Sequence, residues 1–140
     1  MSIASKLRNF VLSCHCGKVR LTCDMESDLS QSGRCNCSSC FKTRMWVHPV
    51  SNINSLKLTT PESNLAVYHY GAKCTGHYFC KSCGTQMYMR GEYPGSPAFA
   101  YVSINCIEGL TQQEFSAIPF AFANGLEDNS NESPKFTNHL

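Results

Sequence analysis

Cysteine is the residue that most constrains this chain, because ten of its 140 residues are cysteines and seven of them stand in three short groups. Residues 1–12 contain no apolar run of signal-peptide length, so we expect a reducing compartment, the cytoplasm or alternatively the nucleus. Clustered thiols bind metal there more often than they form disulfides. A secreted disulfide scaffold is the alternative, and it would require an export signal. The three groups are Cys14 and Cys16; Cys35, Cys37 and Cys40; and Cys80 and Cys83.

The composition predicts one folded domain without nucleic-acid or membrane partners. Hydrophobic residues make up 42% of the chain and charged residues 16%, which is enough apolar material for a core. The net charge is only +2 and no run of Lys or Arg occurs, so a nucleic-acid partner is not expected. No segment approaches the roughly 18 apolar residues of a membrane span. We place the domain at residues 1–126 and expect a mobile polar tail over 127–140, while the oligomeric state stays open.

Short strand-like segments separated by Gly, Pro, Asn and Ser predict an all-β fold of antiparallel sheets with little helix. Each segment is rich in β-branched or aromatic residues, and several alternate in polarity. The expected helix is short, around Thr111–Phe115. The expected strands are Lys18–Cys23, Leu56–Thr60, Ala66–Tyr70, Gly76–Cys80, Thr85–Arg90 and Ala98–Asn105.

Two of the cysteine groups are half-sites for a tetrahedral metal ion such as zinc. Cys80 and Cys83 have the spacing of a zinc knuckle, and Gly84 after them can take the left-handed conformation of a tight turn. Cys14 and Cys16 are the natural second half, since alternate residues of an extended chain point to the same side. Four thiolates would form a closed, structural site. The spacing alone also allows Cys14 and Cys16 to join the third group instead.

Cys35, Cys37 and Cys40 form the denser cluster, with three thiols within six residues. Three protein ligands leave one zinc position open for water or substrate, as in catalytic sites. A fourth protein ligand would instead make a second structural site, and the residue types leave both interpretations open. The single cysteines are expected to be buried thiols. The available fourth ligands are Cys23, Cys74, Cys106, His48, His69 and His77.

Three motifs, in this order along the chain, resemble one known family. The first contains Cys14, Cys16, Gly17, Val19 and Arg20. The second contains Gly33, Cys35, Cys37, Ser38 and Cys40. The third contains Phe79, Cys80, Cys83, Gly84 and Thr85. Together they resemble the glutathione-dependent formaldehyde-activating enzyme family, also called centromere-protein-V-like, over roughly residues 10–105.

The resemblance implies an Mss4-like fold and two zinc ions with different roles. Its structural zinc would be held by Cys14, Cys16, Cys80 and Cys83, and its catalytic-type zinc by Cys35, Cys37 and Cys40. The implied activity is that of a carbon–sulfur lyase acting on a small thiol or its aldehyde adduct, of the S-hydroxymethylglutathione type. The cations Lys42 and Arg44 follow the second cluster and are candidates for binding a glutathione carboxylate. The alternative function is a zinc-stabilised binding module without catalytic activity.

Overall fold

Two sheets form most of this molecule, which we describe from a computed structural model covering residues 6–71, 73–129 and 131–140. The small sheet has the strand order β1-β2-β5, and the large sheet has the order β10-β3-β4-β9-β8-β7-β6. The strands are β1 (Leu7–Ser13), β2 (Arg20–Glu26), β3 (Ser32–Cys35), β4 (Val47–Pro49), β5 (Lys57–Leu58), β6 (Leu65–His69), β7 (Thr75–Cys80), β8 (Gln86–Gly91), β9 (Phe99–Ser103) and β10 (Phe120–Ala123). The α-helices are α1 (Ser38–Thr43) and α2 (Gln112–Ala117), and single 3₁₀ turns are η1 (Ile53–Ser55), η2 (Glu62–Asn64), η3 (Ile104–Cys106) and η4 (Gly125–Glu127).

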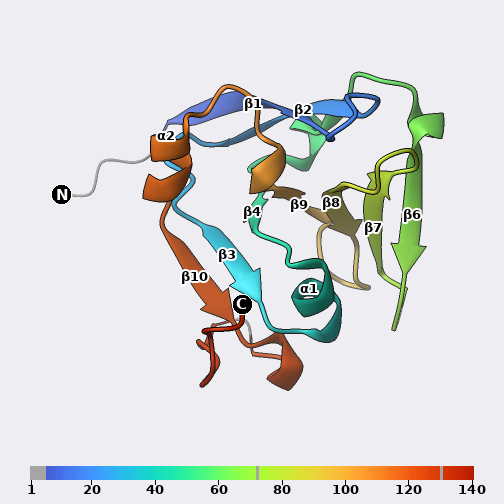
Figure 1. Ribbon diagram of the computed structural model, residues 1–140. Coiled ribbons are helices and arrows are strands. Elements are labelled where there is room, and N and C mark those ends of the chain that lie inside the picture. The colour runs from blue at the N-terminus through green and yellow to red at the C-terminus, as the bar shows by residue number, and fades with distance from the viewer. Residues whose placement is uncertain (1–5, 72, 130) are drawn as a thin grey trace.

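The small sheet lies across one end of the large one, at the top of Figure 1. Strands β1 and β2 pair antiparallel over their full length, from Leu7 opposite Glu26 to Ser13 opposite Arg20. Their inward side chains alternate with exposed ones, as expected for a sheet with one face on the core. The chain is therefore an all-β protein in which both α-helices span only six residues.

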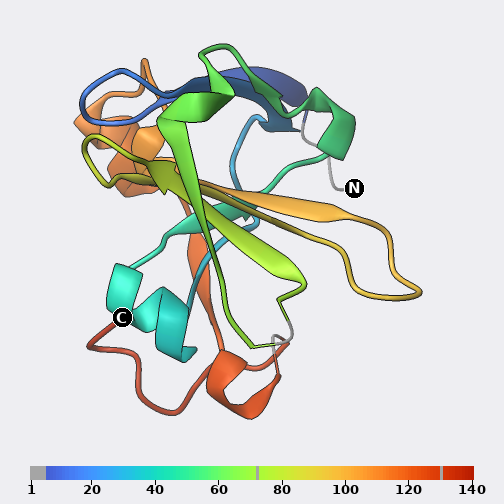
Figure 2. The same cartoon turned by 90° about the vertical axis from the view of Figure 1, so that its right-hand side faces the viewer.

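The large sheet brings together segments that are far apart in the sequence. Its neighbouring strands are antiparallel except for β10, which pairs parallel to β3 from Phe120 opposite Ser32 to Ala123 opposite Cys35. Helix α1 lies between β3 and the β6–β7 hairpin in the view of Figure 1, and in Figure 2 it lies to one side of both. This arrangement places the second cysteine cluster close to the β6–β7 side of the sheet.

One apolar core fills the space between the two sheets. Trp46 belongs to this core, and its Nε1–H donates to the Ser32 hydroxyl at 3.0 Å, so the indole is both buried and hydrogen-bonded. Largest among the fully buried side chains are Phe10, Leu12, Leu21, Met25, Met87 and Ile104. Because these residues come from both sheets, the core joins them into one folded unit.

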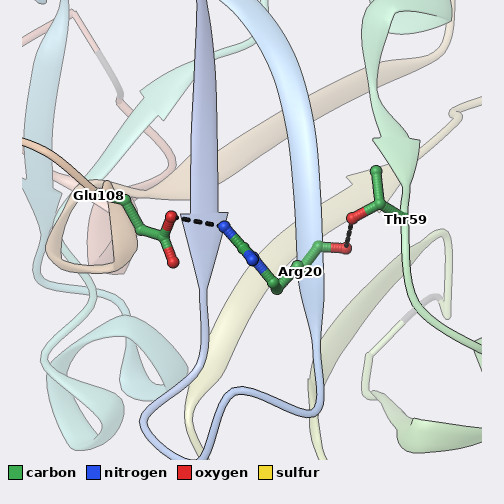
Figure 3. Close-up of polar contacts among 3 residues, drawn as sticks. All are labelled: Arg20, Thr59 and Glu108. Carbon is green, nitrogen blue, oxygen red and sulfur yellow. Dashed lines mark hydrogen bonds and ion pairs between the residues drawn. The ribbon is translucent and has the colours of Figure 1, made fainter.

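Polar contacts also connect the small sheet to later parts of the chain. Arg20, at the start of β2, forms an ion pair with Glu108 at 2.7 Å, and its carbonyl accepts a hydrogen bond from the Thr59 hydroxyl at 3.1 Å (Figure 3). Both charged side chains are well exposed, so the ion pair contributes little to stability on its own. The ion pair instead helps to position β2 next to the segment after η3.

Every strand predicted from the sequence is present, with ends shifted by at most three residues. The predicted helix is α2, which begins with a capping box between Thr111 and Glu114. Four strands and α1 were not predicted: β1, β3, β4 and β10 lie in segments that we had left without structure. Among the described residues, no helix has the length and apolar character needed to cross a bilayer.

The polar C-terminal segment, which we expected to be mobile, lies against α1. The His139 ring packs edge-on to Phe41 with ring centroids 5.4 Å apart. The Arg44 guanidinium donates to the His139 carbonyl at 3.4 Å, and Pro134 is buried. The segment therefore covers one side of the helix that carries Cys40.

Candidate metal centres and the adjoining cavity

The first cluster joins the two sheets through four cysteines whose sulfurs all lie within 4.8 Å of one another: Cys14, Cys16, Cys80 and Cys83. Cys16 Sγ is 3.6 Å from both Cys14 Sγ and Cys80 Sγ. A disulfide would require about 2.05 Å. The observed separations instead match the roughly 3.8 Å edge of a tetrahedron with metal–sulfur bonds of about 2.3 Å. The donor set therefore fits a tetrahedral zinc ion.

Two tight turns bring these sulfurs together. The Gly17 N–H donates to the Cys14 carbonyl at 3.1 Å, and the Gly84 N–H donates to the Cys80 carbonyl at 2.9 Å. Both glycines have positive φ, +80° and +76°, which side chains disfavour. We expected Cys14 and Cys16 to converge from an extended strand. The two sulfurs do converge, but the expected extended backbone was wrong, because Cys16 lies in a turn after β1 has ended.

Hydrogen bonds to the sulfurs favour the thiolate form of Cys80 and Cys83 in this cluster. Cys80 Sγ accepts from the backbone N–H groups of Ser82 and Cys83 at 3.4 and 3.5 Å. The Thr85 hydroxyl lies 3.2 Å from Cys83 Sγ and lowers the pKa of that thiol to about 5. Hydrogen-bond donors directed at ligand sulfurs are typical of a metal centre.

The second cluster contains Cys35, Cys37 and Cys40, again with all sulfurs within 4.8 Å. Cys35 ends β3, Cys37 caps the N-terminus of α1, and Cys40 lies within that helix. Cys37 Sγ accepts from the Cys40 N–H at 3.4 Å. Hydrogen bonds from the Cys35 and Cys40 side chains lower the pKa of Cys37 to about 2. Hydrogen bonds with the Cys35 and Cys37 side chains raise the pKa of Cys40. The Cys37 thiolate thus disfavours a second thiolate at Cys40, and a cation between the sulfurs would offset that repulsion.

The turn after β10 forms the back of the second cluster. The Asn36 side chain donates to Asn124 Oδ1 and accepts from the Leu126 N–H, each at 3.0 Å, which holds η4 against the cluster. A Cβ added to Gly125 would lie 2.4 Å from Cys35 Sγ and 2.9 Å from Cys37 Cβ. Only a glycine fits at this first position of η4, beside Cys35 and Cys37.

Within the described part of the chain, no fourth Cys, His, Asp or Glu joins the second cluster. His48 is buried, and its two ring nitrogens lie 2.8 Å from the Pro49 carbonyl and 3.3 Å from the Gln31 N–H. Cys23 and Cys106 are buried, and burial raises the pKa of both thiols. Cys74 is half-buried, so the expectation that it is buried holds only in part. His69 is exposed, and His77 lies in the cavity described next.

A cavity of about 560 Å³ opens between α1 and the β6–β7 hairpin. Tyr70 connects this cavity to the second cluster, because its hydroxyl lies 3.9 Å from Cys37 Sγ. Burial, together with the negative charge of Cys37, raises the pKa of Tyr70 to about 12, so the phenol keeps its proton at neutral pH. The residues that line the cavity are Ser38, Ser39, Lys42, Thr43, Tyr68, Tyr70, His77, Phe79 and Gln86.

The two cations after the second cluster point to different places. Lys42 lines the cavity beside Tyr70, but Arg44 does not. Arg44 takes a left-handed backbone conformation, φ +53°, at the C-terminus of α1, and its side chain reaches the His139 carbonyl. The structure thus brings Lys42 but not Arg44 to this cavity, and joint binding of a carboxylate by the two cations stays a prediction.

Several residues beside the second cluster were missed by sequence reasoning. We had considered His77 only as a metal ligand and Tyr70 only as the end of a strand, whereas both line the cavity. Asn36 and Gly125 were not considered at all. The sequence carried no signal for Gly125, because its closeness to Cys35 arises from a contact across 90 positions.

Comparison with known proteins gives three matches. The family model described as glutathione-dependent formaldehyde-activating enzyme matches residues 9–119. A protein of Emericella nidulans, provisionally named a glutathione-dependent formaldehyde-activating enzyme, is 28% identical over 115 residues, or 79% of this chain and 57% of that protein. The crystal structure of a Rhodobacter sphaeroides protein shares the fold, with a TM-score of 0.67 and 22% identity over 79% of this chain and 99% of the other.

These matches agree with the two cysteine clusters and with the sheet architecture. The chain spans only 57% of the length of its Emericella relative, so the relative's name describes a longer protein. The fold likeness to the Rhodobacter protein supports the architecture and no particular activity. Because the family model covers most of its length, this chain belongs to the glutathione-dependent formaldehyde-activating enzyme family.

Proposed function

We propose that this protein is a zinc-dependent carbon–sulfur lyase that acts on a small thiol or its aldehyde adduct, of the S-hydroxymethylglutathione type. The observation that carries this proposal is the three-cysteine cluster beside an open cavity, with Tyr70 between them. Family membership supports a glutathione-related substrate. Reduced thiol clusters persist in reducing compartments, so we also propose a cytoplasmic location.

Both clusters hold zinc in this proposal, with different roles. The four-cysteine cluster is closed by protein ligands and is structural. The cluster of Cys35, Cys37 and Cys40 has three ligands and so suits an exchangeable fourth. A zinc ion there would supply a soft Lewis acid that favours the thiolate form of a substrate sulfur. The thiolate donor set fits that preference better than it fits activation of water.

The chain's own residues bind and orient the substrate. Lys42 supplies the one cationic side chain among the cavity-lining residues and is placed to hold a carboxylate of the thiol. The Tyr70 hydroxyl keeps its proton and can donate a hydrogen bond to an oxygen bound next to Cys37. In the synthetic direction the thiol sulfur adds to the aldehyde carbon, and the thiol proton ends on the new hydroxyl. Cleavage reverses these steps.

The test is the rate of exchange between formaldehyde and its glutathione adduct, followed by ¹³C exchange NMR with labelled formaldehyde. We expect the zinc-loaded protein to accelerate exchange above the spontaneous rate. Cys40→Ser should abolish the acceleration, and Lys42→Ala should weaken it mainly through a higher KM. No acceleration by a protein that retains both zinc ions would favour the binding module.

A further inference from the structure

The wall of the cavity opposite α1 is aromatic. Tyr68 and Tyr70 stack with ring centroids 6.0 Å apart and planes 15° from parallel, and the Tyr70 ring lies 5.4 Å from His77. Phe79, from the neighbouring strand β7, lines the same cavity. Although they face a cavity, Tyr68 and Tyr70 remain 56% and 40% exposed. An exposed group of large rings above a cavity is typical of a binding surface for an apolar group.

This wall begins directly beside the second cluster. The Tyr70 hydroxyl is 3.9 Å from Cys37 Sγ, and the rings of Tyr70 and Tyr68 extend away from that point along β6. The opposite wall, formed by α1, is polar and contains Ser38, Ser39 and Lys42. The cavity therefore has one face suited to a charged, hydrogen-bonding group and another suited to an apolar group.

A thiol–aldehyde adduct has two halves that correspond to these faces. The thiol half of a glutathione-like substrate is polar and anionic, which suits the α1 face. The aldehyde half contributes the carbon bonded to sulfur and its substituent. In a formaldehyde adduct that substituent is a hydrogen atom, which would leave the aromatic wall without a partner.

We propose that the aldehyde half of this enzyme's substrate carries an aromatic or aliphatic substituent, which packs against Tyr68 and Tyr70. This proposal rests on the lyase function proposed above and specifies its substrate class. The reaction is the same addition as for formaldehyde: the thiol sulfur bonds to the aldehyde carbon, and the thiol proton passes to the carbonyl oxygen. The rings contribute binding by removing apolar surface from water, so they select the aldehyde and take no part in proton transfer.

Binding is tested first, without turnover, using two stable thioethers and the zinc-loaded protein. S-benzylglutathione and S-methylglutathione share the tripeptide and differ only in the sulfur substituent. We expect calorimetry to show roughly tenfold tighter binding of the benzyl compound, which corresponds to about three of its six additional carbons becoming half buried, at about a factor of two each. Equal affinities, or no binding of either compound, would overturn the proposal.

Two variants test whether the aromatic wall of the cavity causes the difference in affinity between the two thioethers. Tyr68→Ala should weaken S-benzylglutathione binding about three- to tenfold and leave S-methylglutathione binding unchanged. Tyr93→Ala is the matched control, since Tyr93 is also exposed, at 47%, and stacks on Phe99 outside the cavity. If Tyr68→Ala weakens both ligands equally, or if Tyr93→Ala has the same effect, the ring is not a substituent site.

Turnover then separates this proposal from the lyase function. Exchange NMR is run with glutathione and either formaldehyde, butanal or phenylacetaldehyde. We expect kcat/KM to rise roughly two- to fourfold for each carbon added to the aliphatic aldehyde. A preference for formaldehyde would overturn the substituent proposal and leave the lyase function intact. No acceleration with any aldehyde would overturn both.

Discussion

Gly125 is a position where one added methyl group would collide with the second cysteine cluster. Its backbone passes so close to Cys35 that a methyl group there would lie 2.4 Å from the sulfur. Gly125→Ala should therefore displace Cys35 and reduce the zinc content from about two to about one per chain. The free energy of unfolding should fall by roughly 2 kcal/mol, as for other overpacked sites. Elemental analysis and denaturant unfolding measure the two effects.

Gly95 provides the control for this substitution. It has φ +79° and no heavy atom within 4 Å of an added Cβ, so alanine there strains the backbone without touching a sulfur. Gly95→Ala should cost about 1 kcal/mol and retain both zinc ions. If the two alanine variants keep the same zinc content, contact with Cys35 is not the reason for the glycine.

His48 makes a separate prediction about pH at the residue scale. Its Nε2 accepts from the Gln31 N–H and its Nδ1 faces the Pro49 carbonyl, which is the pattern of a neutral imidazole that donates from Nδ1. Burial lowers the pKa of His48 below its usual value of 6.5. The unfolded chain then binds more protons than the folded one below about pH 6.5, so stability falls as the pH falls through that value.

Replacing this histidine tests the effect. His48→Gln keeps hydrogen-bonding capacity but does not titrate. We expect the wild-type protein to lose stability more steeply between pH 7 and 5, by up to about 1.4 kcal/mol per pH unit. Urea unfolding of both zinc-loaded proteins over this range gives the difference, in which the shared titration of the thiols cancels. Parallel curves would show that His48 is not held neutral.

Elements with a regular pattern were predictable from the sequence, and the shortest ones were not. Strand β7 has β-branched and aromatic residues between turn residues, and α2 has a complete capping box. Helix α1 spans six residues and is capped by the thiol of Cys37 instead of Ser, Thr, Asp or Asn, so neither its length nor its cap marked it. Strand β10 has a single partner, β3, and their parallel pairing depends on a contact between distant segments.

The same distinction applies to the candidate site. Spacing placed the seven thiols in three groups and left open which partner Cys14 and Cys16 join; the structure brings them to Cys80 and Cys83. The sequence also indicated the turn at Gly84, but not the one at Gly17. The cavity was not visible in the sequence, because Lys42 and Tyr70 meet only once α1 lies across the β6–β7 hairpin. Local patterns therefore predicted the cysteine groups, while tertiary packing determines which groups meet and which residues line the cavity.

The two cations at the C-terminal end of α1, Lys42 and Arg44, are expected to have different roles. Arg44 lies at φ +53° at the helix C-terminus, a position that favours glycine. Arg44→Gly should raise the free energy of unfolding by about 0.5–1 kcal/mol and leave the KM for the thiol unchanged. Lys42→Ala should instead raise the KM for the thiol and leave the free energy of unfolding unchanged. If Arg44→Gly raises the KM as much as Lys42→Ala does, both cations contact the substrate.

At the scale of the whole molecule, the two clusters occupy different positions relative to the two sheets. Cys14 and Cys16 follow β1 of the small sheet, whereas Cys80 ends β7 of the large sheet and Cys83 lies in the turn before β8. The first cluster therefore joins the sheets. The second cluster lies within the large sheet and α1, so a metal ion bound there would join fewer distant segments.

Loss of metal should accordingly occur in two steps with different consequences. The purified protein should contain about two zinc ions per chain. A mild chelator should first remove the zinc held by Cys35, Cys37 and Cys40, since three ligands hold an ion less firmly than four and leave a position for the chelator. Activity should disappear at this step while the circular dichroism spectrum persists. A stronger chelator should then remove the second ion and unfold the chain, because binding at a closed site contributes directly to folding.

Three cysteine variants distinguish this order from a single event. Cys83→Ser should unfold or aggregate, because it breaks the cluster that joins the sheets. Cys40→Ser should retain one zinc and most of the fold but lose activity. Cys106→Ala removes a buried thiol outside both clusters and should keep two zinc ions. If Cys83→Ser and Cys40→Ser melt at the same temperature, both clusters are structural, and the difference in role assigned to them is wrong.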